Sequence, residues 1–154
     1  MIPEFVMFIG IPGCGKSTWL KKHKPDTHIV VCPDKIREEL TGDISDQSIN
    51  IEAWKEAYSR IIDALNSGFN VILDSTNLDV LHRKNLLKSL PECTLKAVVF
   101  EVEPEEAFRR ISNAINAGEN RSMVPEHVVY RYYGDFLYTN KVLKSEGFAV
   151  EFAD

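Results

Sequence analysis

The sequence is poor in cysteine and has no excess of basic charge. Its three cysteines are scattered through 154 residues and form no C-x-x-C pair. This pattern excludes a disulfide framework and argues against a structural zinc site. The four histidines show no metal-ligand spacing. The net charge of −5 excludes a wholly basic nucleic-acid-binding coat but leaves room for a local basic groove.

The sequence also lacks a long apolar run. No stretch has the length needed to span a bilayer, and the N-terminus does not have the pattern of a signal peptide. We therefore expect a protein of the reduced cytoplasm (the host cytoplasm if a phage encodes it) that makes no membrane contact. A chain of 154 residues that is 44% hydrophobic suffices for one three-layer core. We expect residues 1–154 to form a single domain.

The most informative segment follows the apolar run of residues 5–9. Residues 10–18 read Gly-Ile-Pro-Gly-Cys-Gly-Lys-Ser-Thr, which is G-x-x-x-x-G-K-[ST] between an expected strand and an expected helix. In this motif the backbone N–H groups cradle phosphates, the lysine supplies positive charge and the serine hydroxyl ligates Mg²⁺. The alternative is a glycine-rich turn followed by a chance Lys-Ser. We predict that ATP and Mg²⁺ are cofactors, that Lys16 is catalytic, that Ser17 is a direct Mg²⁺ ligand, and that ATP contacts Gly13, Cys14, Gly15, Lys16, Ser17 and Thr18.

Strand-like and helix-like segments alternate along the rest of the chain. This order predicts an α/β fold in three layers, with a mostly parallel sheet of about five strands. Ligands on such sheets bind at the carboxyl ends of the strands. The expected strands cover residues 5–9, 28–32, 70–73, 95–102 and 148–152, and the expected helices cover 16–23, 34–41, 48–66, 79–89, a segment from 104, and 125–145.

Two charged residues follow the second expected strand. Asp34 lies at the carboxyl end of that strand, where it can face the phosphate loop and accept a proton from an acceptor hydroxyl. The alternative is that Asp34 only caps the next helix. Arg37 lies three residues further on, on the same helix face, and is either an anion-binding residue or a solvated surface charge. We predict that both residues are catalytic and bind the acceptor.

The third expected strand ends in Asp-Ser-Thr-Asn, residues 74–77. An apolar strand that ends in aspartate typically places a carboxylate behind the direct Mg²⁺ ligands, and we assign that role to Asp74. Thr76 and Asn77 are candidates for binding the acceptor, although Asp74 and Asn77 could instead cap the next helix. Arg83, on that helix, is a further acceptor-binding candidate or part of a solvated basic face.

A polar stretch between Phe108 and Pro125 is the expected lid, at about residues 110–124. Lid arginines stabilise the charge of a transferring phosphoryl group and exclude water, although each arginine here could be an ordinary surface charge. We predict that Arg110 and Arg121 bind ATP and that Arg121 is catalytic. Aromatic residues crowd the helix after the lid, where they either stack on nucleobases or pack on the sheet: Tyr130, Tyr132, Tyr133, Phe136 and Tyr138.

Together these motifs resemble those of the polynucleotide 5′-hydroxyl kinases, the end-healing kinases of phages and bacteria in the P-loop kinase superfamily. The phosphate loop, the D-x-x-R of Asp34 and Arg37, the D-x-T-N of residues 74–77 and the arginine-bearing stretch before Pro125 occur in the family's order over nearly the whole chain. The resemblance implies a P-loop kinase fold with a helical lid. It also implies transfer of the ATP γ-phosphate to the 5′-hydroxyl end of DNA or RNA in nucleic acid repair. In the family, the aspartate is the general base and the arginine contacts the phosphate beside the terminal nucleoside.

Family members are often fused to a phosphatase or ligase domain, for which 154 residues leave no room, so separate phosphatase or ligase partners are expected. Two other functions use the same phosphate loop. One is a kinase for a nucleoside, metabolite or antibiotic, in which Arg37 meets an anionic group of a small molecule. The other is a regulatory NTP-binding switch with a conformational output, which leaves Asp34 without a task.

Overall fold

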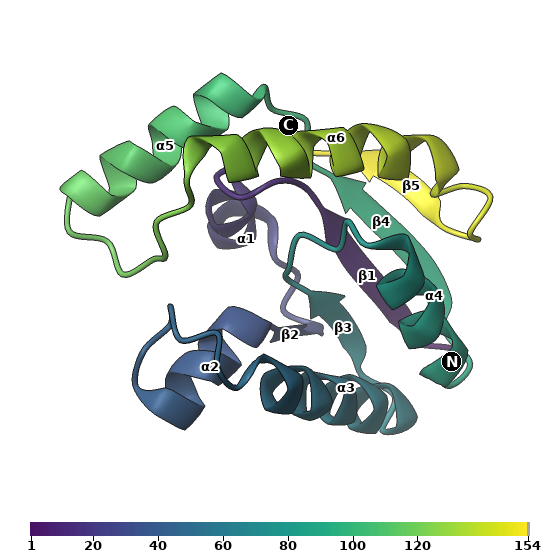
Figure 1. The fold of residues 1–154 in the computed structure, drawn as a ribbon. Helices are drawn as coiled ribbons and strands as arrows, with labels where there is room; N and C mark the ends of the chain where they lie inside the picture. The colour runs from purple at the N-terminus through teal and green to yellow at the C-terminus, as the bar shows by residue number, and fades with distance from the viewer. Residues whose placement is uncertain (154) are drawn as a thin grey trace.

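The computed structural model describes residues 1–153 and is built around a five-stranded sheet (Figure 1). Every strand pairing in the sheet is parallel. The strand order is β2-β3-β1-β4-β5, and the predicted α/β class with a parallel sheet of about five strands is confirmed. The strands are β1 (Glu4–Ile9), β2 (His28–Val31), β3 (Asn70–Leu73), β4 (Thr94–Val99) and β5 (Ala149–Phe152).

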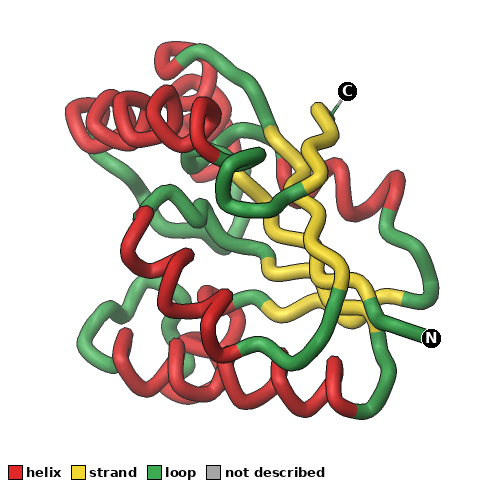
Figure 2. Tube along the Cα trace, turned by 90° about the vertical axis from the view of Figure 1, so that its right-hand side faces the viewer, coloured by secondary structure: helices red, strands yellow, loops and turns green. Residues whose placement is uncertain are grey.

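Helices lie on both sides of the sheet, which gives the expected three layers (Figure 2). The helices α2 and α3 pack against each other beside β2 and β3, and α5 and α6 lie together on the other side of the molecule (Figure 1). None of the helices in residues 1–153 is long and apolar enough to cross a membrane. They are α1 (Lys16–His23), α2 (Pro33–Thr41), α3 (Asn50–Asn66), α4 (Val80–Ser89), α5 (Pro104–Asn116) and α6 (Glu126–Val142).

The central strand β1 explains why the sheet is covered on both faces. Its residues from Phe5 to Ile9 are all buried, without alternation of apolar and polar side chains, as is typical of a parallel strand between two helical layers. Helix α3 supplies part of one layer through Ala53, Ala57 and Ile61, which are fully buried and lie four residues apart on one face. The fold therefore rests on a continuous apolar core around β1.

Several element boundaries differ from the expected ones by one to three residues, and two of these differences have clear local reasons. The helix expected from residue 48 begins at Asn50, because the side chain of Asp46 accepts a hydrogen bond from Ser48 N at 2.9 Å and holds that segment in a turn. The strand expected to end at residue 102 ends at Val99. Its neighbour β1 turns into the phosphate loop after Ile9, so no ladder partner continues beside it.

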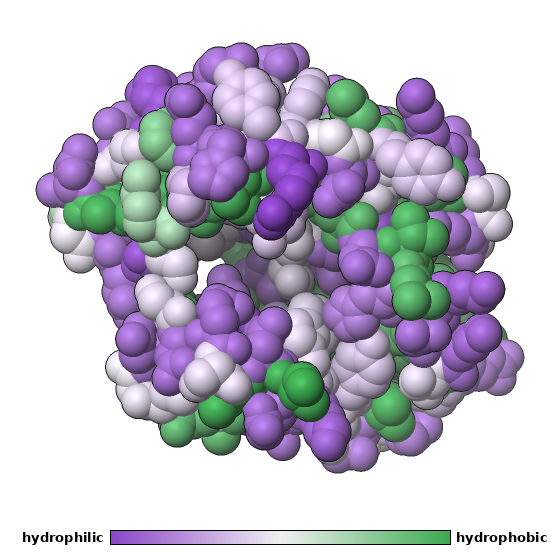
Figure 3. All heavy atoms as spheres, in the orientation of Figure 1, coloured by the Kyte–Doolittle hydropathy of each residue, from purple (hydrophilic) through white to green (hydrophobic). Residues whose placement is uncertain are grey.

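The parallel arrangement brings the carboxyl ends of the strands to one edge of the sheet. The residues that directly follow β1, β2, β3 and β4 at this edge are, in order, Gly10, Cys32, Asp74 and Phe100. The surface of the molecule is hollowed between the half that carries α2 and α3 and the half that carries α5 and α6 (Figure 3). The predicted functional segments all begin at this edge.

Candidate active site

The phosphate loop has a backbone that only glycine adopts without strain at two positions. Gly13 has φ 81° and Gly15 has φ 102°, both in the left-handed region. A Cβ atom on Gly13 would lie 2.5 Å from the carbonyl oxygen of Ala107, so the loop also packs too tightly against α5 for a side chain. Helix α1 begins directly after this loop and has no side-chain cap. Its first N–H groups are therefore available to an anion.

Lys16 lies at the start of α1 with its ammonium group turned back over the loop. The Nζ atom donates to the carbonyl oxygens of Gly10 at 3.5 Å and Ile11 at 3.3 Å, and it lies 3.5 Å from Cys14 Sγ. All three partners are uncharged, so the positive charge of Lys16 is not neutralised by a hydrogen-bonded carboxylate. An ammonium group held in this way over unpaired backbone N–H groups suits a polyphosphate.

Asp74 follows β3 and lies near the charged groups of Lys16 and Asp34. Burial raises the pKa of its carboxyl above the ordinary value, while the nearby Lys16 charge opposes that shift and Asp34 adds to it. Burial, followed by the charge of Asp74, raises the pKa of Cys32 to about 11, so this thiol stays protonated at neutral pH. The structure thus brings Lys16, Asp34 and Asp74 together.

Asp34 and Arg37 form an ion pair on the first turns of α2. Arg37 Nη2 donates to Asp34 Oδ1, and Arg37 Nη1 donates to Asn50 Oδ1 at 3.0 Å. The Asp34 side chain is 61% exposed while that of Arg37 is 8% exposed. Helix α2 begins after Cys32 with Pro33 in its first turn and no side-chain cap. Asp34 therefore does not cap the helix, and its carboxylate is exposed.

Thr76 and Asn77 lie in the loop between β3 and α4. The carbonyl oxygen of Thr76 accepts a hydrogen bond from Gly10 N at 3.3 Å, which ties this loop to the phosphate loop. Asn77 is buried with φ 53°, and its Nδ2 donates to Phe8 O at 2.7 Å. Neither Asp74 nor Asn77 caps α4, because the cap is Asp79, whose side chain accepts from His82 N at 2.9 Å. Asn77 thus shapes the loop with its amide nitrogen.

The prediction that Arg83 binds the acceptor is wrong. Arg83 is 1% exposed, and its Nε and Nη2 each donate to a carboxylate oxygen of Glu146 at 2.9 Å. Its Nη1 donates to Asn77 O and Thr139 Oγ1, each at 3.0 Å. The sequence pattern placed Arg83 on a helix near the site but could not reveal that Glu146, 63 residues away, turns the guanidinium into the interior.

The two lid arginines are placed differently. Arg110, in the middle of α5, brings Nη1 to 3.5 Å from the position that a Cβ atom on Gly15 would take, so its guanidinium lies beside the phosphate loop. Arg121 lies in the segment between α5 and α6. Within residues 1–153, the buried side-chain nitrogens without a hydrogen-bond partner are Arg121 Nε and Arg37 Nε. Buried polar atoms are normally paired, so both arginines have donor capacity that the fold itself does not use.

A hydroxyl at the start of α1 and a nearby carboxylate are candidate ligands for a divalent cation. Ser17 is exposed at the phosphate loop, and the half-buried Asp74 carboxylate lies near Lys16. Within residues 1–153, no cluster of three or more His, Cys, Asp or Glu side chains has metal-binding geometry. One hydroxyl with one nearby carboxylate fits an ion such as Mg²⁺, which keeps waters and shares substrate phosphates as ligands.

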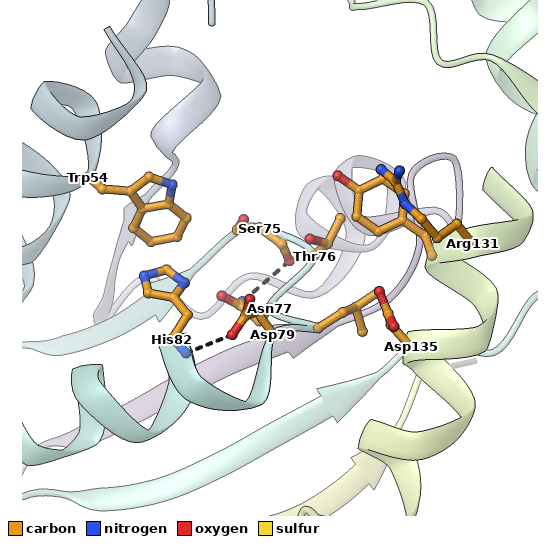
Figure 4. A pocket seen from close by; sticks show the side chains of 10 residues that line it. Trp54, Ser75, Thr76, Asn77, Asp79, His82, Arg131 and Asp135 are labelled. Carbon is orange, nitrogen blue, oxygen red and sulfur yellow. Dashed lines mark hydrogen bonds between the residues drawn. The ribbon is translucent and has the colours of Figure 1, made fainter. Parts of the chain in front are cut away.

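A second hollow adjoins the loop of Thr76 and contains residues that sequence reasoning missed. It has a volume of about 250 Å³ and lies between α3, the β3–α4 loop, α4 and α6. Trp54 and His82 form one side and Arg131 lies on the other (Figure 4). The aromatic crowding on α6 has a mixed explanation, because Phe136 is buried in the core while Tyr132 lines this hollow. Only the fold could show that Trp54 reaches the same place.

A parallel sheet of order 2-3-1-4-5 with a glycine-rich loop between β1 and α1 defines a nucleotide-binding α/β protein of the phosphate-loop class. The chain belongs to the AAA domain family, whose characteristic sequence matches residues 5–136.

A curated relative and two solved structures are similar to this chain. The chain is 27% identical over 114 residues to the "Putative bifunctional polynucleotide phosphatase/kinase" of Acanthamoeba polyphaga mimivirus, covering 71% of this chain and 23% of the relative. A chain in the structure of the Pnkp1/Rnl/Hen1 RNA repair complex superposes with a TM-score of 0.80 at 22% identity, covering 91% of this chain and 46% of that one. A chain in another structure of the Pnkp1/Rnl/Hen1 complex gives a TM-score of 0.64 at 26% identity, covering 71% and 39%.

These comparisons confirm the P-loop kinase fold expected from the motifs. The chain spans 23% of the curated relative's length and less than half of each solved chain. The activities of those longer proteins are therefore considered for this chain only as a proposal.

Proposed function

We propose that this protein is an ATP-dependent kinase that phosphorylates the 5′-hydroxyl end of DNA or RNA. The observation that carries the proposal is the pair formed by Asp34 and Arg37. An exposed carboxylate, held by a buried arginine with an unpaired Nε, lies close to the Asp74 and Lys16 side of the phosphate loop. This arrangement offers a proton acceptor and an anion-binding group beside a polyphosphate cradle.

The donor side consists of the phosphate loop, Lys16 and Ser17. The loop N–H groups and Lys16 bind the ATP phosphates. The Ser17 hydroxyl would hold Mg²⁺, with Asp74 behind it, and the ion would supply positive charge to the β- and γ-phosphates. Burial of Asp74 keeps this side partly shielded from water, which strengthens each charge interaction in the transition state.

The acceptor side carries out the proton transfer. The 5′-hydroxyl oxygen attacks the γ-phosphorus, the bond from phosphorus to the bridging oxygen of ADP breaks, and the hydroxyl proton passes to an Asp34 carboxylate oxygen. Arg37 orients Asp34 through Nη2 and binds the phosphate 3′ to the terminal nucleoside. Asn50 fixes the Arg37 guanidinium from the other side.

Residues 110–124 act as the lid in this proposal. Arg110, beside Gly15, and Arg121, with its unpaired Nε, stabilise the charge of the transferring phosphoryl group. In the structure the segment contacts the opposite half of the molecule, since Asn120 Nδ2 donates to Glu38 and Ser122 Oγ lies 3.1 Å from Ser45 Oγ. Such contacts are available to a closed lid that keeps water from the reaction.

The relatives support the substrate class. The mimivirus protein carries polynucleotide phosphatase/kinase in its name, and the solved complexes pair Pnkp1 with Rnl and Hen1 in RNA repair. By analogy, a separate phosphatase, ligase or other end-processing enzyme would act on the same ends before or after this chain.

An acceptor panel with γ-labelled ATP tests the proposed function. A 5′-hydroxyl oligonucleotide, a nucleoside 3′-monophosphate, a plain nucleoside and water are compared. We expect label on the oligonucleotide and on the nucleoside 3′-monophosphate, with little on the nucleoside. Equal use of the plain nucleoside would favour a small-molecule kinase, and release of label to water alone would favour a regulatory NTPase. Either result would contradict the proposal.

A further inference from the structure

An aromatic cluster lies one helical turn from the proposed acceptor-phosphate site. The ring of Trp54 on α3 meets the ring of His82 on α4 edge to face, with centroids 4.3 Å apart at 90°. Tyr58, one turn further along α3, stacks on His82 with centroids 5.8 Å apart at 15°. Burial lowers the pKa of His82, and the nearby Asp79 carboxylate opposes that shift. Trp54 and His82 thus form an aromatic wall on one side of the hollow.

A second wall faces this cluster across the hollow of about 250 Å³. It comes from α6, where the Arg131 guanidinium carbon lies 5.9 Å from the centroid of the Tyr132 ring and Asp135 lies one turn further on. Ser75 and Thr76 lie between the two walls (Figure 4). The hollow thus combines opposed planar groups with hydroxyl and carboxylate side chains at its base and rim. Planar heteroaromatic rings with polar edges fit such a site.

Two residues connect the surroundings of the hollow to the proposed acceptor site and the phosphate loop. Thr76 lines the hollow and also connects to the phosphate loop through the Gly10 N hydrogen bond at 3.3 Å. Asn50, which holds Arg37 Nη1 at 3.0 Å, lies one turn before Trp54 on α3 and lines the adjoining groove together with Trp54 and His82. A nucleotide whose 3′-phosphate binds Arg37 therefore has this hollow within reach of its base.

We propose that the hollow between Trp54 and His82 on one side and Arg131 and Tyr132 on the other binds the nucleobase of the 5′-terminal nucleotide of the acceptor. This inference rests on the proposed function. Stacking accepts any base, because every base has a π face. The pocket would act on all 5′ ends that carry a terminal base and would discriminate against ends that have lost it.

A pair of matched acceptors tests this inference. One is a 5′-hydroxyl oligonucleotide, and the other is identical except that its terminal nucleotide is abasic. Base stacking on aromatic side chains changes binding by roughly 5- to 150-fold per base, so we expect the wild type to favour the base-bearing acceptor in kcat/KM by a ratio in this range. In Trp54→Leu the ratio should fall toward one, whereas Trp54→Phe should keep most of it. Both variants keep an apolar side chain in place of the half-buried indole.

Phe69→Ala is the matched control, because Phe69 is an exposed aromatic residue that precedes β3 at the opposite edge of the sheet. This variant should keep the wild-type ratio. The KM for ATP is measured in each variant and should not change.

Several outcomes would overturn the inference. A wild type that uses both acceptors equally would overturn it while leaving the proposed function standing. A preference that survives Trp54→Leu would place base recognition elsewhere, and a raised KM for ATP in that variant would assign the hollow to the donor nucleotide. Absence of transfer to any 5′-hydroxyl end would overturn the proposed function and this inference together.

Discussion

At the scale of single residues, the proposed role of Asp34 as a general base predicts that a change at this residue affects proton transfer and not ATP binding. Asp34→Asn keeps the size of the side chain and a partner for Arg37 but cannot take a proton. We expect turnover to fall by about 10²–10⁴-fold while ATP affinity stays near the wild-type value, measured by steady-state kinetics and by nucleotide titration. A collapse of ATP affinity with no separate loss of turnover would move Asp34 to the metal site or to the fold.

We expect Arg37 to act on the acceptor rather than on ATP. A charge-assisted hydrogen bond to a phosphate contributes about 1.5–3 kcal/mol, so Arg37→Ala should raise the acceptor KM by roughly 10- to 150-fold and leave the ATP KM unchanged. The preference for a nucleoside 3′-monophosphate over a plain nucleoside should vanish in this variant. If the variant keeps that preference, Arg37 does not bind the acceptor phosphate.

We expect the Asp74 carboxylate to lower the free energy of unfolding at neutral pH while it supports the binding of ATP and Mg²⁺. Burial raises the pKa of its carboxyl in the folded state, because ionisation is less favourable there than in the unfolded chain. The free energy of unfolding therefore falls as the pH rises above the ordinary aspartate pKa of about 3.9. Asp74→Asn removes this cost. We expect the variant to be more stable than wild type to urea at pH 7 without nucleotide, and the difference to disappear below about pH 4, where both folded and unfolded wild type are protonated.

The functional side of that exchange is tested by adding ATP and Mg²⁺ to the same urea titrations. They should stabilise the wild type more than Asp74→Asn. A variant that is less stable than wild type at pH 7 in the absence of ligand would contradict the assignment of burial as the dominant effect on Asp74.

At the scale of elements, the buried ion pair of Arg83 and Glu146 joins α4 to the turn after α6 and, through Asn77 O, to the β3–α4 loop. Removing one partner of a buried pair leaves an uncompensated charge, which costs about 3–5 kcal/mol. We expect Glu146→Ala to lower the free energy of unfolding by that amount, measured in urea. The double variant Arg83→Met, Glu146→Ala should be less destabilised than the sum of the single changes.

The exposed pair network of Arg60 with Glu39 and Glu56 provides the control. The Arg60 side chain is 42% exposed, and exposed ion pairs contribute about 0–1 kcal/mol. Arg60→Ala should therefore have a small effect. If Arg60→Ala and Glu146→Ala lower the free energy of unfolding equally, the buried pair of Arg83 and Glu146 does not stabilise the fold more than an exposed pair does.

At the scale of the whole molecule, the sequence was sufficient to predict the sheet, the order of the helices and the phosphate loop, because these depend on local apolar patterns and on a motif with fixed spacing. The caps and contacts between distant segments were not predictable. Asp79 rather than Asp74 or Asn77 caps α4, because the loop continues beyond Asn77 and the helix begins at Val80. Arg83 lies in a buried ion pair with Glu146 rather than at the acceptor site or on a solvated basic face. Trp54, for which we predicted no role, lines a pocket, and both placements depend on partners far away in the chain.

The net charge of −5 also bears on the whole molecule. A protein with a negative net charge gains less from the long phosphate backbone of its substrate than a basic one does. Binding should therefore concentrate on the end of the strand, where Arg37 and the lid arginines supply local positive charge. Short acceptors suffice for a test of the central claim.

That claim is the coupling of the phosphate loop to an acceptor hydroxyl through Asp34, and one reaction measures it. ADP formation and 5′-phosphate formation are followed together on a 5′-hydroxyl dinucleotide, with and without the acceptor. We predict one 5′-phosphate for each ADP, little ADP formation when the dinucleotide is omitted, and loss of both products in Asp34→Asn. ADP formed at the same rate without the acceptor, or formed without any 5′-phosphate on the dinucleotide, would contradict the account.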